Sequence, residues 1–191
     1  VDVETDLSGG LPSFSIVGLP DISIKESKER VRSALKNSGY SFPVSRITVN
    51  LAPANLKKEG SQIDLPIAIG ILSANKVIEK NVDEGTCIIG ELSLDGKINA
   101  VDGALPMVIS MLSNNFKRII IPEDNKEECG SVNGIDVIPV ESIRDLVNYF
   151  NGYIDIEPYI ASYAPSQSIE IFQEDFSEIK GQPAMKRAVE I

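Results

Sequence analysis

The segment that begins at Asp64 constrains the fold most, because it predicts a helix that is apolar on every side. Pro66 falls in the first turn, where a proline costs no hydrogen bond, and Asp64 is placed to cap the helix. The residues that make it apolar all round are Ile67, Ala68, Ile69, Ile71 and Leu72. A helix without a polar face has to be covered on all sides, so we expect it at the centre of a layered fold.

Strand and helix patterns alternate along the rest of the chain. Predicted strands cover residues 1–17 in two pieces around Ser8-Gly9-Gly10, then 46–51, 86–93, 97–101, 118–121 and 135–140. Predicted helices cover residues 21–36, 103–114, 124–129 and 142–150, in addition to the central one. This order predicts an α+β fold with helices packed on a mixed β-sheet in a two-layer arrangement.

Local motifs fix several of these boundaries. Asp21 or Ser23 can cap the first helix, whose buried stripe is Ile24, Val31 and Leu35. Asp95-Gly96 favours a type I′ turn and so predicts a hairpin. Ser142 with Asp145 three residues later resembles a capping box at the start of the last helix of the domain.

The pattern ends after Gly152. We expect one domain over residues 1–152, a Pro/Ser/Tyr-rich linker over 153–173 and the start of a second module over 174–191. The first residues already read as a strand, so we also expect the sequence to be part of a longer protein.

Histidine is absent from the 191 residues, which excludes Ser-His-Asp and Cys-His catalysis and histidine-ligated metal sites. Two cysteines, Cys87 and Cys129, are too few for a Cys₄ zinc site or a disulfide framework, and a cytoplasmic location is the default expectation. No apolar stretch is long enough to span a membrane, and none reads as a secretory signal. We predict no metal site and no membrane partner.

Charge is unevenly distributed in a chain of net charge −10. Eight cations and two carboxylates between Lys25 and Lys58 give that segment a charge of +6, which leaves −16 elsewhere. The first helix carries a row of cations at spacings of three and four, and these form the predicted nucleic-acid contact: Lys25, Lys28, Arg32 and Lys36, with Lys57 and Lys58. The alternative is a solvated helix flank in which Lys25 pairs with Glu29.

Ser61 and Lys58 raise the one nucleophile hypothesis, because a serine beside a desolvated lysine can attack acyl groups without histidine. The alternative is a polar loop residue that assists entry into the next helix. Glycine-rich turns such as Ser8-Gly9-Gly10 match no phosphate loop or dinucleotide fingerprint.

Four strings together resemble the Mg-chelatase-related ComM/YifB family: GLPSFSIVGLPD (10–21), KESKERVR (25–32), ITVNLAPA (47–54) and KEGSQIDLPIAIGIL (58–72). The resemblance covers essentially the whole chain. It implies a Lon-protease-like N-terminal domain of the ribosomal protein S5 domain 2-like fold, placed ahead of an AAA+ ATPase module. That fold contains a left-handed β-α-β crossover, which periodicity would not predict.

The resemblance extends to the tail, where residues 175–182 look like the opening of an AAA+ module. It implies that Ile179, Gly181 and Gln182 lie near the adenine. The sequence ends before any Walker A or B motif, so we expect no ATP hydrolysis and no cofactor in residues 1–191. ATP and magnesium are expected for the full-length protein.

Comparison with Lon places Gln62 at the position of the nucleophile and Leu105 at that of the catalytic lysine. Glutamine is no nucleophile and leucine cannot take a proton, so we predict no catalytic residue here. The resemblance implies a ring-forming, ATP-dependent motor that acts on DNA in competence or recombination, by branch migration in ComM-like relatives. The domain would contact DNA or neighbouring subunits; the alternatives are a purely structural assembly module and, third, a Ser/Lys hydrolase.

Overall fold

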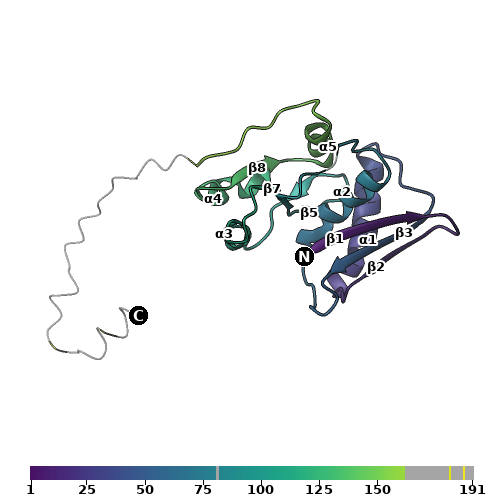
Figure 1. Cartoon of the computed structure of the whole chain (residues 1–191), viewed down its shortest axis with the longest axis horizontal. Helices are drawn as coiled ribbons and strands as arrows, with labels where there is room; N and C mark the ends of the chain where they lie inside the picture. The colour runs from purple at the N-terminus through teal and green to yellow at the C-terminus, as the bar shows by residue number, and fades with distance from the viewer. Residues whose placement is uncertain (81, 162–180, 182–186, 188–191) are drawn as a thin grey trace. The chain divides into compact units, whose positions relative to one another are not determined.

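The computed structural model describes residues 1–80 and 82–161, together with Gly181 and Arg187 (Figure 1). Residues 1–161 form one compact unit, which ends at Ala161 rather than at the predicted Gly152. Most of the predicted linker and almost all of the predicted second module lie outside the described residues. Among the helices described here, none combines the length and apolarity that crossing a membrane requires.

Strands and helices follow the predicted order closely. The strands are β1 (Asp2–Ser8), β2 (Ser13–Val17), β3 (Arg46–Ala52), β4 (Thr86–Ile88), β5 (Glu91–Leu92), β6 (Ile98–Asn99), β7 (Arg118–Pro122) and β8 (Asp136–Val140). The helices are α1 (Ile22–Asn37), α2 (Asp64–Ala74), α3 (Ala104–Ser113), α4 (Lys126–Cys129) and α5 (Ile143–Asn151). Short 3₁₀ turns, Ser61–Ile63 and Glu123–Asn125, precede α2 and α4.

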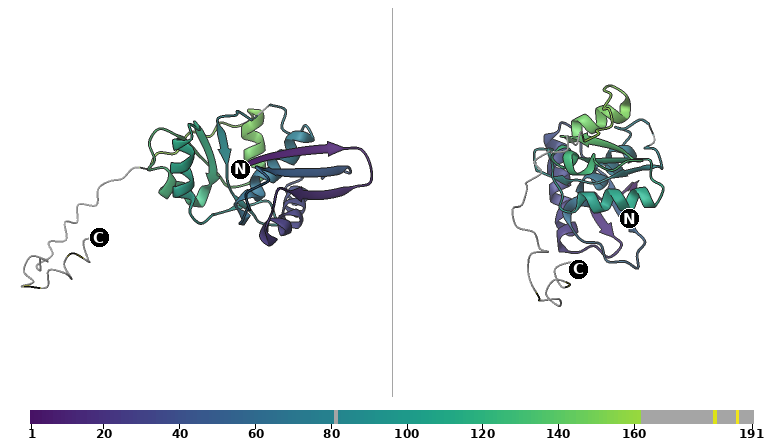
Figure 2. Two further views of the ribbon diagram at one scale, coloured as in Figure 1. Left: turned by 60° about the horizontal axis from the view of Figure 1, so that its bottom comes forward. Right: turned by 90° about the vertical axis from the view of Figure 1, so that its left-hand side faces the viewer.

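The first sheet has the order β1-β3-β2. β3 pairs antiparallel with β1 and parallel with β2, so the two N-terminal strands do not pair with each other (Figures 1 and 2). Alternation along β3 buries Ile47, Val49 and Leu51, while Thr48 and Asn50 point to the other face, as predicted. One face of this sheet is therefore covered and the other is polar.

The central position predicted for α2 is confirmed, because its apolar side chains from Leu65 to Leu72 are almost fully buried. The helix packs on β1 and on α1. At Gly70 it comes so close to the sheet that an added Cβ would lie 2.5 Å from the Thr5 hydroxyl oxygen. Glycine therefore sets the distance between α2 and the sheet.

The second sheet, β4-β7-β8, is parallel throughout. Its central strand β7 is buried on both faces: Ile120 packs into the core shared with α1 and α2, whereas Ile119 and Ile121 pack into a smaller core with α3 and α4. The predicted fold class, helices on mixed β-sheet structure, is confirmed, with several small sheets in place of one.

The predicted hairpin is present but short, with β5 paired to β6. Its turn is not type I′, which requires positive φ at both central residues. Only Gly96 has positive φ, at 91°, and its N–H donates to the Ser93 carbonyl at 3.0 Å. The Lys97 N–H donates instead to the Asp95 carboxylate at 3.0 Å, which stabilises the alternative turn.

Two of the three predicted helix caps are confirmed. Asp21 accepts from the Ile24 N–H at 2.8 Å, and Ser142 accepts from the Asp145 N–H at 3.2 Å. The cap predicted at Asp64 is wrong: Ile63 occupies that position, and Asp64 is the first residue of α2. Its side chain turns away from its own helix to the residues described next.

Candidate functional site

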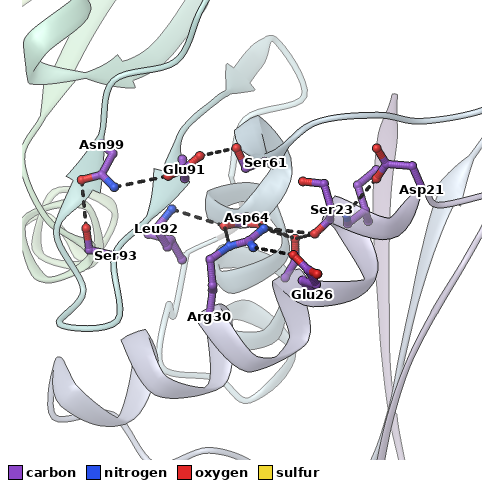
Figure 3. A network of polar contacts seen from close by, with 12 residues as sticks. Asp21, Ser23, Glu26, Arg30, Ser61, Asp64, Glu91, Leu92, Ser93 and Asn99 are labelled. Carbon is purple, nitrogen blue, oxygen red and sulfur yellow. Dashed lines mark hydrogen bonds and ion pairs between the residues drawn. The ribbon is translucent and has the colours of Figure 1, made fainter.

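A buried polar cluster, which we call the Asp64 cluster, joins α1, α2 and the β5-β6 hairpin (Figure 3). Asp64 and Ser27 are fully buried. The Asp64 carboxylate accepts from Arg30 Nε at 2.6 Å and Nη2 at 3.1 Å, and also from the Ser27 hydroxyl. The Leu92 N–H lies 3.4 Å from the same carboxylate. Residues 28 to 37 positions away from Asp64 in the sequence thus meet at one buried charge.

Electrostatics inside the cluster is balanced. The hydrogen bond to Asp64 raises the pKa of Arg30, against the opposing effect of burial, so Arg30 stays charged. A buried carboxylate is tolerated because it is paired and hydrogen-bonded. Asp64 and Ser27 have no solvent contact and the Arg30 side chain is 23% exposed, so the cluster chiefly holds three elements together.

A second polar chain lies beside the first, on the solvent side of the hairpin (Figure 3). The Ser61 hydroxyl donates to the Glu91 carboxylate, and Asn99 Nδ2 lies 3.4 Å from the same carboxylate. The Ser93 hydroxyl donates to Asn99 at 2.9 Å. The loop before α2 is therefore tied to the hairpin.

Groups required for Ser/Lys chemistry do not come together at this loop. Ser61 has a carboxylate as its partner, while the Lys58 ammonium donates to the Pro53 carbonyl and Lys58 is only 4% exposed. Gln62, at the position that resembles Lon's nucleophile, donates to the Glu59 carbonyl at 2.9 Å. Leu105 is the second residue of α3.

The predicted cation row lies on one flank of α1, beside the buried stripe of Ile24, Val31 and Leu35. Lys25, Arg32 and Lys36 are exposed and Lys28 is half-buried. The Arg32 guanidinium sits 5.3 Å from the centre of the Phe42 ring.

Two members of the predicted contact differ from the helix residues. Lys57 is exposed and pairs with Glu59. Lys58, however, is buried, and its ammonium donates to the Pro53 carbonyl. It therefore does not lie on the exposed surface with the other predicted contact residues. The spacing of α1 revealed the row on the helix, but a loop lysine gives no such signal.

The sequence did not reveal the role of Arg30. The one local signal is Ser27, a polar residue within the buried stripe of α1, three positions before Arg30.

Of the three predicted adenine-side residues, the structure describes Gly181. Ile179 and Gln182 lie outside the described residues, and Gly181 has a positive φ of 79°. Within residues 1–80 and 82–161 there is no group of three metal-ligating side chains.

Comparison with known proteins identifies the family of the chain. The model of the family "Subunit ChlI of Mg-chelatase" matches residues 3–125. Over its full length the chain is 37% identical to the uncharacterized protein YifB of Escherichia coli and 36% identical to the competence protein ComM of Haemophilus influenzae.

These relatives are longer, since the chain spans 37% of the first and 38% of the second. A weaker similarity, 26% identity over 125 residues, relates 65% of the chain to 22% of Lon protease 2 of Bacillus subtilis. The chain is thus similar to YifB and ComM over its full length and more weakly to Lon proteases, and it belongs to the Mg-chelatase subunit ChlI family.

Proposed function

We propose that this chain is the non-proteolytic domain of an ATP-driven protein that processes DNA, and that the cation-bearing flank of α1 contacts the DNA. The observation that carries the proposal is the cation row of α1, defined as Lys25, Lys28, Arg32 and Lys36. Among the described residues, none of the four is in an ion pair with a carboxylate, so their charges are available to phosphates.

The position of the row also supports the proposal. α1 is fixed from its inner side, through Ser27 and Arg30, to Asp64. The side chains of the cation row can therefore lie on a rigid surface, which lowers the ordering cost of binding. The net charge of −10 opposes DNA binding by the surface as a whole, and this limits the contact to the basic segment.

The non-proteolytic part of the proposal rests on chemistry. Gln62 and Leu105 stand where the resemblance to Lon places the nucleophile and the lysine, and neither can take part in acyl transfer. Lys58 cannot replace the lysine, because its ammonium donates to the Pro53 carbonyl in a buried position.

ATP hydrolysis would belong to the longer protein. The resemblance of residues 175–182 to the opening of an AAA+ module supports this, with Ile179, Gly181 and Gln182 on the adenine side. In that protein, ATP with magnesium would supply the energy, and several copies would assemble into a ring.

Charge reversal of the cation row tests DNA contact. The variant changes Lys25, Lys28, Arg32 and Lys36 to Glu in the full-length protein; Lys58 is left unchanged because its burial would make reversal a folding defect. We expect DNA affinity to fall at least tenfold and the slope of log affinity against log salt to flatten by about 3 to 4, one for each lost phosphate contact.

Four exposed lysines outside the row provide a matched control: Lys76, Lys80, Lys97 and Lys117. Reversal of these four lysines changes the net charge by the same amount. It should leave the slope of log affinity against log salt within one unit of the wild-type slope. Equal losses in both variants, or none in either, would overturn the proposed contact.

A second candidate function, assembly with neighbouring copies, is favoured by a different observation. Apolar side chains are exposed in and beside two loops at one end of the first sheet, namely Val17 (45%) at the end of β2, Leu19 (56%), Ile22 (74%) at the start of α1 and Leu56 (57%). The loops are joined by backbone bonds, from the Lys58 N–H to the Leu19 carbonyl at 3.2 Å and from the Asp21 N–H to the Lys58 carbonyl at 3.1 Å. Exposed apolar side chains on a fixed backbone are typical of subunit contacts.

Sedimentation separates the two candidates. If the domain is an assembly module, the chain self-associates without DNA, and Leu19→Ser with Ile22→Ser abolishes this. The matched control, Leu94→Ser with Ile109→Ser, alters side chains that are 56% and 50% exposed elsewhere on the domain and should have no effect. A chain that stays monomeric at all accessible concentrations would remove the second candidate.

A further inference from the structure

The last described stretch of the compact unit, residues 153–161, is not a free linker. It leaves α5 at Gly152 and returns along the molecule to the region of β8 and α4 (Figures 1 and 2). Ile156 packs against the larger core on the way. The segment therefore crosses from one core of the domain to the edge of the other.

Tyr159 anchors the end of this segment. Its N–H donates to the carbonyl of Val137, on the edge strand β8, at 2.8 Å. Its hydroxyl donates to the Glu127 carboxylate of α4 at 2.6 Å, and the Lys126 ammonium sits 5.5 Å from the centre of its ring. Backbone, hydroxyl and ring are thus each engaged by a different group.

Gly130 allows the close approach. The Ala161 N–H donates to its carbonyl at 3.0 Å. A Cβ at position 130 would lie 2.6 Å from the Tyr159 ring and 2.9 Å from the Ala161 nitrogen. Any residue other than glycine would push the segment away.

We propose that residues 156–161 are a releasable strap, which fixes the point at which the chain leaves this domain when docked and frees the following residues when open. The attachment is strong enough to define one position, since it combines two backbone bonds with the Tyr159 side-chain contacts. Because the chain continues from Ala161, docking of the strap determines where the next residue starts.

Release is possible because little apolar surface holds the strap at its far end. Ile160 is 77% exposed, and the Tyr159 contacts are polar and lie at the surface. A cavity of about 330 Å³ remains between the strap and the domain, lined by Gly130, Asn133, Pro158 and Tyr159 among others. Contacts of this kind open locally without unfolding the cores.

Amide hydrogen exchange of the 191-residue chain tests the strap. In the wild type we expect the Tyr159 and Ala161 amides to be protected relative to an unstructured peptide, yet to exchange well before those of β7. Tyr159→Phe removes only the bond to Glu127 and should speed exchange at Ala161 about fivefold, as expected for one lost hydrogen bond. Gly130→Ala should increase the rate further.

Tyr153→Phe is the matched control, because Tyr153 is 72% exposed and its hydroxyl has no hydrogen bond with any described residue. It should leave the strap amides unchanged, and none of the three variants should alter β7. Exchange of the wild-type strap at the unprotected rate would overturn docking. Exchange at the rate of β7 would overturn release, because the strap would then open only with the whole domain.

Discussion

The two regions of the domain bury their strands differently. In the region of α1 and α2, the β1-β3-β2 sheet is covered on one face only, and the Asp64 cluster places a charge inside the core. In the region of α3 and α4, β7 is covered on both faces, and the buried polar side chain is the neutral amide of Asn125, which bonds to the backbone of Val101 at 2.9 and 3.1 Å. Both regions thus combine an apolar core with a buried polar anchor, which is a charged pair in the first region and a neutral amide in the second.

Removal of the buried carboxylate should have the largest effect and tests the polar side of this comparison. We expect Asp64→Ala to lower the free energy of unfolding by about 3 to 5 kcal/mol, because Arg30 and the Ser27 hydroxyl lose their partner. Urea denaturation measures the loss. Asp6→Ala, at an exposed position on β1, is the control and should cost no more than about 0.5 kcal/mol.

An all-apolar replacement sharpens the same test. Combining Asp64→Leu, Arg30→Met and Ser27→Ala removes the whole cluster, and we expect it to recover at least half of the stability lost in Asp64→Ala. If Asp64→Ala cost less than about 1 kcal/mol, the cluster would contribute little and the contrast between the regions would disappear.

A smaller effect is expected from shortening a side chain of β7, the strand that lies between the two cores. Ile120→Val removes one methylene group from β7 and should cost about 1 kcal/mol, through lost burial and a small cavity. Ile109→Val on α3, where the side chain is 50% exposed, should cost markedly less. Equal losses at both positions, measured by thermal or urea unfolding, would show that β7 is less tightly packed than its burial indicates.

Near neutral pH, the smallest effect on the free energy of unfolding concerns the thiols of the second region. Burial raises the pKa of Cys129 from 9.0 to about 12, and it also raises the pKa of Cys87. At pH 8 we expect Cys129 in the native chain to alkylate about 10³-fold more slowly than in the unfolded chain, because the thiolate is the reactive form.

The sign of the pH dependence follows from the same shift. Between pH 9 and pH 12 the unfolded thiol ionises while the native thiol stays protonated, so this group lowers the free energy of unfolding as the pH rises. Cys87→Ala leaves Cys129 as the only thiol of the 191 residues, so the alkylation rate measured on this variant belongs to Cys129. Rapid labelling of that variant under native conditions would show that the smaller core opens frequently.

Local patterns predicted most of the fold. Period-2 alternation identified β3, a fully apolar run identified α2, and side-chain caps identified the starts of α1 and α5. The S5 domain 2-like class came from resemblance rather than from periodicity. The predicted turn type of the hairpin was wrong because Asp95-Gly96 is compatible with two turn types, and the neighbouring backbone decides between them.

The site was harder to predict, since its essential contacts join distant positions. Nothing local shows that Asp64 turns toward Ser27 and Arg30 and does not cap its own helix. The cation row on α1 could be predicted because helical spacing brings its members to one side. Burial of Lys58 could not be predicted, because it depends on a carbonyl in a loop whose conformation is set by the rest of the fold.

The position of β3 between its partners has a consequence for the order of assembly during synthesis. β1 and β2 emerge from the ribosome before β3, yet each forms its ladder with that strand, which ends at Ala52. Neither strand can pair until β3 is available, so a nascent chain that does not yet include β3 cannot form the sheet. Early folding must therefore wait for contacts that are distant along the chain, which slows the search for the native pairing.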